Sequence, residues 1–225
     1  MSPSSRIALG PLRQQYFDAL WARDSHRARA IIDRGLAAGA APADVALEVL
    51  VPTLRAFGDQ WEHGGVTIAQ EHYATGITEG VMAMLAMRMR RPPRGGRLAV
   101  VTCPVGERHG LPARILGDFL ESAAWEVIVT GPDVPTRDLL ELVTDEQPDL
   151  VCVSVTLPQH AEAAVELLGA LGTVEPRPVL AIGGQAWDGN TRIAQAIGAD
   201  LAAGDPRELL AILAERLPPL PDEEG

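Results

Sequence analysis

The feature that most constrains this fold is the alternation of short apolar runs with helical patterns after residue 97. Five runs are typical of buried strands, and they lie at 97–103, 126–130, 149–155, 178–182 and 200–202. Stretches with helical periodicity follow them at 110–123, 136–146, 160–171, 190–197 and 206–216. Repeated strand–helix units predict an α/β domain over residues 98–217, with a doubly wound, flavodoxin-like sheet of five parallel strands.

Residues 1–90 carry helical periodicity and no convincing strand. The apolar spacing predicts four helices with short connections, and therefore an antiparallel four-helix bundle. The expected start signals are an apolar stripe from residue 10, a cap at Ser25, Pro42 in a first turn and a Thr67–Gln70 capping box. Pro52 should kink the third helix, and the fourth should reach about Arg90. Residues 91–97 are expected to be a linker, and the tail 218–225 to be disordered.

Composition limits the classes of function. The formal charge of −11 and the pI of about 4.9 argue against direct binding to nucleic acid, which needs a basic face. All 19 cationic residues are arginine, so Schiff-base and Walker-type lysine chemistry is excluded. The two cysteines, Cys103 and Cys152, end apolar runs and are expected to be small buried side chains. With no signal peptide and no apolar run of membrane length, we expect a cytoplasmic protein without membrane contact.

Three loops that follow strands carry the chemistry of the α/β half. His109 follows the first strand, Ser154-Val155-Thr156-Leu157 ends the third, and Gly183-Gly184 follows the fourth. In a flavodoxin-like sheet these strands are neighbours, so their carboxyl ends share the crevice where such sheets bind ligands. An imidazole there can coordinate a metal while its other nitrogen is held by a second group. Small polar residues and glycines leave room for a large, mainly apolar ligand.

The order and spacing of these residues resemble those of cobalamin-binding domains of the base-off/His-on type. In that family Asp-x-His-x-x-Gly comes first, Ser-x-Leu follows at a long and nearly fixed separation, and Gly-Gly follows at a shorter one. This chain has Glu107-x-His109-x-x-Pro112, then Ser154-x-Thr156, then Gly183-Gly184, and both separations match. Three positions depart from the pattern: Glu107, Pro112 and Thr156.

The resemblance implies that His109 is the lower axial ligand of cobalt and Glu107 its hydrogen-bond acceptor. It also implies that Ser154 and the two glycines accommodate the displaced nucleotide tail of the cofactor. The expected cofactor-binding residues of this half are Glu107, His109, Gly110, Ser154, Thr156, Leu157, Gly183 and Gly184.

The helical half carries a second pattern. Trp61 lies near the end of the third expected helix, and Glu71-His72 lie just over one turn into the fourth. His72, Gly76 and Gly80 share a stripe that leaves room for something bulky, while Tyr73, Ile77 and Val81 are expected to face the bundle core.

Trp-x9-Glu-His before a cobalamin domain resembles the light-sensing, adenosylcobalamin-dependent transcriptional regulators of the CarH/LitR type. The resemblance covers about residues 10–215. It implies that Trp61 covers the upper ligand and that Glu71 and His72 contact the adenosyl group. Two features depart from that family. The bundle begins almost at residue 1, so we expect no MerR-like DNA-binding domain. The histidine that follows the tryptophan in the best-known photoreceptors is Glu62 here, so His63 or His72 is the candidate upper ligand after loss of the adenosyl group.

The sequence thus favours a non-enzymatic cobalamin-binding sensor, with adenosylcobalamin between the bundle and the sheet and light breaking its cobalt–carbon bond. Methylcobalamin and hydroxocobalamin are the alternative forms of the cofactor. Output would pass through a regulatory protein partner or a homo-oligomer. Two other interpretations remain open: a corrinoid shuttle subunit of a methyltransferase, and a light-insensitive cobalamin-binding antirepressor.

Overall fold

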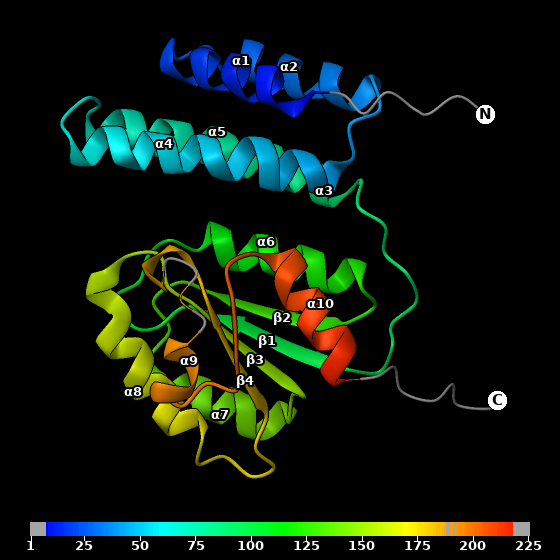
Figure 1. Ribbon diagram of the computed structural model, residues 1–225, viewed down its shortest axis with the longest axis vertical. Coiled ribbons are helices and arrows are strands. Elements are labelled where there is room, and N and C mark those ends of the chain that lie inside the picture. The colour runs from blue at the N-terminus through cyan, green and yellow to red at the C-terminus, as the bar shows by residue number, and fades with distance from the viewer. Residues whose placement is uncertain (1–7, 188–189, 191, 218–225) are drawn as a thin grey trace. The chain divides into compact units, whose positions relative to one another are not determined.

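Figure 1 shows a computed structural model of the chain, which describes residues 8–187, 190 and 192–217. The chain divides into two compact units, Met1–Met89 and Arg90–Gly225. No helix in the described residues is both long and apolar enough to span a membrane.

The first unit is entirely helical in its described residues. Its elements are α1 (Leu9–Trp21), α2 (Ser25–Ala37), α3 (Pro42–Val45), η1 (Ala46–Leu50), α4 (Val51–Glu62) and α5 (Ile68–Ala86). The capping box is confirmed, because the Thr67 hydroxyl accepts from the Gln70 N–H and the Gln70 side chain accepts from the Thr67 N–H. The cap expected at Ser25 is wrong: the Asp24 carboxylate accepts from the Arg27 N–H at 2.8 Å, and Ser25 is the first residue of α2.

The third expected helix is a continuous helical run over residues 42–62 that contains one π-helical turn, η1. Pro52 lies two residues after this turn. Proline lacks an N–H and its ring crowds the carbonyl four residues earlier, so an ordinary α-helical turn would leave a broken hydrogen bond there. The π-helical turn widens the helix next to Pro52, so the irregularity caused by the proline is accommodated without ending the helix.

The bundle core differs from the expected stripe on α5. The buried residues of α5 are Ala74, Thr78, Val81, Met82, Leu85 and Ala86, whereas Tyr73 and Ile77 are only half-buried. The reason is a polar contact: the hydroxyls of Tyr16 on α1 and Thr78 are hydrogen-bonded at 3.0 Å in the core. Thr78 also donates to the carbonyl of Ala74 within α5, so its buried hydroxyl is fully satisfied.

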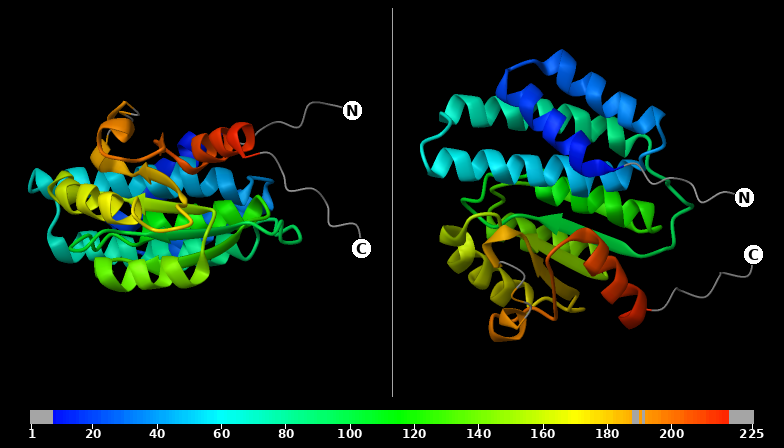
Figure 2. Two further views of the ribbon diagram at one scale, coloured as in Figure 1. Left: turned by 90° about the horizontal axis from the view of Figure 1, so that it is seen from below. Right: turned by 45° about the horizontal axis from the view of Figure 1, so that its top comes forward.

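The second unit contains the expected five-stranded parallel sheet (Figure 2). The strands are β1 (Leu98–Thr102), β2 (Glu126–Gly131), β3 (Leu150–Ser154), β4 (Val179–Gly183) and β5 (Leu201–Ala203), in the order β2-β1-β3-β4-β5. The helices are α6 (Leu111–Ser122), α7 (Thr136–Glu146), α8 (Ala161–Leu171), α9 (Ile193–Ala196) and α10 (Pro206–Arg216), with 3₁₀ turns η2 (Pro158–His160) and η3 (Gln185–Trp187). Helices α6 and α10 cover one face; α7, α8 and α9 cover the other.

The prediction of a doubly wound sheet is therefore confirmed, with β3 between β1 and β4. Helix α9 is shorter than the expected 190–197, and residue 191 and the tail 218–225 lie outside the described residues. Both cysteines are buried and free.

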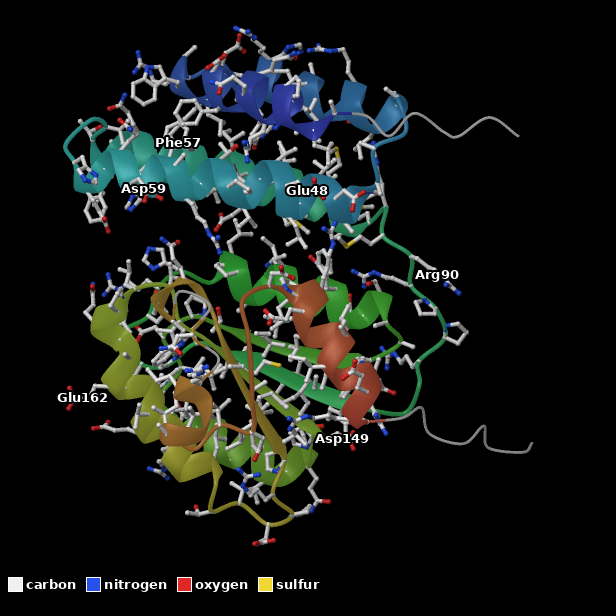
Figure 3. All side chains as sticks on the ribbon, in the orientation of Figure 1. Glu48, Phe57, Asp59, Arg90, Asp149 and Glu162 are labelled. Carbon is white, nitrogen blue, oxygen red and sulfur yellow. The ribbon has the colours of Figure 1, made fainter. Side chains whose placement is uncertain are left out.

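Aspartates anchor the amino ends of the strands. The Asp149 carboxylate accepts from the Leu98 N–H at 2.9 Å, and Asp200 accepts from the Leu180 N–H at 2.8 Å. In Figure 3, Asp149 precedes β3 while Glu162 belongs to α8, which follows that strand. These contacts lie at the amino edge of the sheet, opposite the carboxyl edge where the loop with His109 begins.

Candidate functional site

A bulge in β2 shapes the carboxyl edge next to His109. Val101 pairs with Val129 and Thr102 with Gly131, so Thr130 is the extra residue, and its hydroxyl donates to the Thr102 hydroxyl at 2.9 Å. The bulge directs the following loop onto the loop after β1. There, Asp133 accepts from the Gly106 N–H at 2.7 Å and donates its own N–H to the Glu107 carbonyl.

Glu107 is the centre of the site. Its side chain is fully buried and accepts four hydrogen bonds. Oε1 accepts from the backbone N–H of His109 at 3.0 Å and from its ring Nδ1 at 2.5 Å. Oε2 accepts from the N–H groups of Thr156 and Leu157 at 2.8 and 3.1 Å. One carboxylate therefore joins the loop after β1 to the loop after β3.

These contacts fix the protonation state of the pair. Burial alone would raise the pKa of Glu107, but the hydrogen bonds from His109, Thr156 and Leu157 outweigh it and lower the pKa to about 2. The ionised carboxylate is only an acceptor, so Nδ1 of His109 must carry the proton of that hydrogen bond. A metal would then have to bind His109 through Nε2, with the ring held in place by Glu107. The imidazole is 45% exposed, as a ligand-binding group requires.

The glycine pair at the end of β4 is required by the packing of the protein's own backbone. Gly184 has φ +105°, and a Cβ there would overlap the backbone of Val155. A Cβ at Gly183 would lie 2.8 Å from the Ala203 carbonyl oxygen. The close approach expected at these glycines is thus made by the neighbouring loops, which bring Gly183 and Gly184 beside Ser154 and Val155.

Two further residues pack against the His109 loop. Gly110 lies where a Cβ would come within 2.9 Å of the Pro132 side chain, so it keeps the loops after β1 and β2 together. The half-buried His160 ring approaches Gly106, where a Cβ would lie 3.3 Å from Nδ1. The sequence offers no evident partner for His160, so sequence reasoning does not assign it to the site. Its one signal is its place in the segment after β3, at the same edge of the sheet.

The predicted residues of the helical unit lie at one helix–helix turn. Trp61 is near the end of α4 and is 43% exposed. Glu71 lies in the first turn of α5, accepts from the Thr75 hydroxyl at 2.8 Å and lies 3.6 Å from Nε2 of the exposed His72. Within the described residues, no hydrogen bond or ring contact joins Trp61 to Glu71 or His72. His63 follows α4, and its Nδ1 lies 2.7 Å from the carbonyl oxygen of Asp59, a residue labelled in Figure 3.

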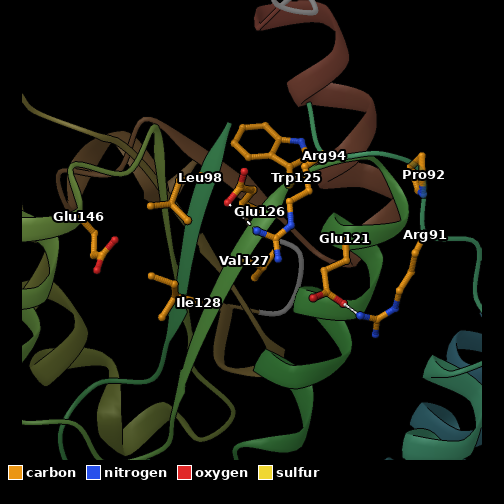
Figure 4. Close-up of a pocket in the computed structure, with 10 residues that line it drawn as sticks. All are labelled: Arg91, Pro92, Arg94, Leu98, Glu121, Trp125, Glu126, Val127, Ile128 and Glu146. Carbon is orange, nitrogen blue, oxygen red and sulfur yellow. Dashed lines mark hydrogen bonds and ion pairs between the residues drawn. The ribbon is translucent and has the colours of Figure 1, made fainter. Parts of the chain in front are cut away.

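A pocket in the second unit is separate from these residues. It has a volume of about 430 Å³ beside the edge strand β2. Figure 4 shows it lined by Arg91 and Arg94, which pair with Glu121 and Glu126, and by apolar side chains of β1 and β2. None of its lining residues is a predicted site residue, so this pocket is not assigned to the cofactor.

The fold and the site define a class: a flavodoxin-like domain that presents one carboxylate-held imidazole at its carboxyl edge, joined to a helical unit. A family model described as "B12 binding domain" matches residues 97–214, and a second model with the same description matches residues 12–86. The chain belongs to this family of B12 binding domains.

The relatives fall into two groups. The chain is 31% identical over 198 residues to the HTH-type transcriptional repressor CarH of Myxococcus xanthus. The aligned region covers 86% of this chain and 64% of CarH. It is 28% identical over 196 residues to the dimethylamine corrinoid protein of Methanosarcina barkeri, covering 83% of this chain and 82% of that protein. The fold matches the monomethylamine corrinoid protein of Methanosarcina barkeri with a TM-score of 0.81 at 18% identity, over 93% of this chain and all of the other. These relatives are repressors and corrinoid proteins, and the chain spans less than two thirds of the CarH length.

Proposed function

We propose that this protein binds cobalamin with His109 as the lower axial ligand of cobalt. The observation that carries the proposal is the buried Glu107 carboxylate, which holds His109 through Nδ1. A metal enclosed by a macrocycle could take a single protein ligand, and a neutral imidazole with a carboxylate partner is suited to that role. The donor set present in the structure therefore fits this cofactor.

The other predicted residues of the α/β unit act in two ways. Thr156 and Leu157 act through their backbone N–H groups, which fix Glu107 and thereby the ring of His109. Ser154 and Gly183 pair at the ends of β3 and β4, next to Gly184, and Gly110 packs against Pro132 in the loop after β2. The nucleotide tail of the cofactor would lie along these small residues.

The upper ligand is the second part of the proposal. Trp61, Glu71 and His72 would contact an adenosyl group, which favours adenosylcobalamin over methylcobalamin or hydroxocobalamin. The surface of α5 supports this assignment, since a Cβ at Gly76 meets nothing within 4 Å and one at Gly80 meets only the tip of Arg29 at 3.8 Å. Bound adenosylcobalamin would supply a cobalt–carbon bond that light can break. His63 or His72 would then be the upper ligand, and His63 would have to bind through Nε2 because Nδ1 faces Asp59.

The output would be a change of conformation or assembly in the cytoplasm. Contacts that Trp61, Glu71 and His72 make only with the adenosyl group would be lost when it leaves, which is the differential binding that a switch needs. A net charge of −11 disfavours DNA as the direct receiver, so a regulatory protein partner or a homo-oligomer is proposed.

A corrinoid shuttle for a methyltransferase is the second candidate, and a specific observation favours it. The chain is 28% identical to the dimethylamine corrinoid protein of Methanosarcina barkeri over 196 residues, which make up 82% of that protein. A shuttle must offer the upper face of its cofactor to other enzymes, so Trp61, Glu71 and His72 would not cover it. The form of cobalamin that the protein retains separates the two functions.

The test is a reconstitution of the full chain with adenosylcobalamin and, separately, with methylcobalamin. A sensor should retain the adenosyl form more tightly, show a His-on spectrum in the dark, and change both spectrum and hydrodynamic radius after green light. A shuttle should retain methylcobalamin at least as well. An adenosylcobalamin complex whose spectrum changes in light without any change in size, small-angle scattering or partner binding would favour the light-insensitive antirepressor.

A further inference from the structure

Trp187 is a buried tryptophan that the proposed roles do not use. It ends η3, directly after the Gly183–Gly184 pair, and its backbone is held by hydrogen bonds to Gly184 and Asn190. The preceding residue, Ala186, donates its N–H to the Val155 carbonyl at 3.1 Å. Since Thr156 in turn donates to Glu107, a chain of contacts links the turn of Trp187 to the support of His109.

The indole N–H of Trp187 has no acceptor among the described residues. The side chain is 9% exposed and packs in the apolar cluster that includes Val153, Val155 and Ile182. Among all the described residues, three buried side-chain atoms lack a hydrogen-bond partner: Thr53 Oγ1, Asp118 Oδ2 and Trp187 Nε1. Only the last belongs to a loop at the carboxyl edge of the sheet. A buried donor without a partner costs about 1–3 kcal/mol, and a phenylalanine would pack there without that cost.

We propose that the indole N–H of Trp187 donates a hydrogen bond to the nucleotide arm of bound cobalamin. This inference rests on the proposed lower ligation by His109. Cobalt has one axial position on its lower face, and the nucleotide arm hangs from that face. If His109 took that position, the arm would be displaced and would lie along the loops around His109. The arm carries phosphate oxygens, ribose oxygens and an unprotonated ring nitrogen, which are all acceptors.

The arm can reach the indole only if this edge moves. Trp187 Nε1 has no exposed surface in the structure, so η3 or the side chains that cover it must shift as the arm enters. The unsatisfied donor offsets part of the cost of that shift, because the penalty of the orphaned N–H is present before binding and absent after it. Trp187 is thus a specificity residue for cobalamins that carry a nucleotide arm.

The experiment compares cobalamin with cobinamide, which lacks the nucleotide arm, on the full chain and on W187F. Dissociation constants come from titrations followed by the visible spectrum. We expect W187F to weaken cobalamin binding about tenfold, the loss of one hydrogen bond of about 1.4 kcal/mol. Cobinamide binding should stay within about twofold. The matched control is W125F, the same change at a residue of the same unit that is also 9% exposed but lies under Arg97, away from the edge. It should change neither constant.

A measurement on the unaltered protein makes the test independent of how the variants fold. With ¹⁵N-labelled tryptophan, the indole N–H resonance of Trp187 should move downfield with cobalamin and stay in place with cobinamide. An unchanged ratio of the two constants in W187F, or an indole resonance that responds equally to both ligands, would overturn the role of Trp187. If the unaltered chain bound neither ligand, the proposed function itself would be wrong.

Discussion

One side chain, that of Glu107, links the His109 loop to the loop after β3. Its two oxygens accept four N–H groups from two loops, so no neutral side chain of the same size can replace it. Glutamine offers one acceptor oxygen and one NH₂ group, and the latter would face donors on whichever side it pointed. Because the group is fully buried, such a mismatch is expensive.

The first prediction concerns E107Q and pH. The pKa of Glu107 lies at about 2 in the folded chain and at 4.5 ordinarily, so its contribution to stability is complete above about pH 4.5 and is lost as the pH falls toward 2. The shift corresponds to about 3 kcal/mol. Urea unfolding of the full chain at pH 6 and pH 3 should show E107Q to be less stable at pH 6, with a smaller loss on acidification. Equal loss in both proteins would show that Glu107 is not the group that titrates.

The second prediction concerns His109. H109A should bind cobalamin more weakly and give a base-off spectrum, because no imidazole then occupies the lower position of cobalt. The control is H160A, which removes the neighbouring half-buried imidazole at the same edge. Its complex should keep the His-on spectrum. The assignment of His109 is wrong if H109A keeps a His-on spectrum and H160A loses it.

At this scale the sequence predicts which residues gather but not how they are bonded. The spacing of Glu107, His109 and Ser154 locates the site. The donors that lower the pKa of Glu107 include backbone N–H groups of Thr156 and Leu157, and a backbone amide is the same in nearly every residue. The role of Trp187 is hidden for a related reason, since its missing partner is visible only once the surrounding apolar cluster is assembled.

The loops at the carboxyl edge are packed backbone against backbone. The β3 and β4 loops approach so closely at Gly184 that a side chain would overlap Val155, and the φ of +105° is strained for any other residue. The backbone of the loops after β3 and β4 is therefore closely packed at Gly184 and Val155.

The third prediction compares two glycines of the same unit. G184A should lower the free energy of unfolding by about 2–4 kcal/mol, since it adds steric overlap to backbone strain. G169A lies in the interior of α8, where a Cβ meets nothing within 4 Å, and should stabilise by about 0.5–1 kcal/mol. Urea denaturation measures both. If G184A is no less stable than the unaltered chain, the close approach of the two loops is wrong.

At the scale of elements, the patterns with a local cause were predictable. The strands follow from apolar runs, and α5 begins at a capping box whose two partners are close neighbours in the sequence. Non-local contacts caused the errors. The inward face of α5 is set by the hydrogen bond between Tyr16 and Thr78, which are 62 positions apart, and periodicity alone favoured the neighbouring stripe.

At the scale of the molecule, the segment that joins the two units is held by side-chain contacts. The sequence predicts a solvated linker at residues 91–97. In the structure Arg91 pairs with Glu121 at 2.6 Å and Arg94 with Glu126 at 3.1 Å, both from the α/β unit. Arg97 donates to the Leu217 carbonyl at 2.7 Å and lies over the ring of Trp125. The arginines of this segment pair with the α/β unit, while most of its residues remain exposed.

The last prediction tests whether both units serve one ligand. If Trp61 contacts the upper ligand, W61A should weaken adenosylcobalamin binding about tenfold, the scale of one buried aromatic contact. Hydroxocobalamin, which has no adenosyl group, should bind W61A as well as the unaltered chain. Trp21 is the matched control because it lies in the same unit and is also 43% exposed, but belongs to α1 and stacks on Phe17. Titration of each variant with both cobalamins separates the outcomes: W21A should resemble the unaltered chain, and a W61A that behaves like W21A would leave the whole of cobalamin binding to the α/β unit.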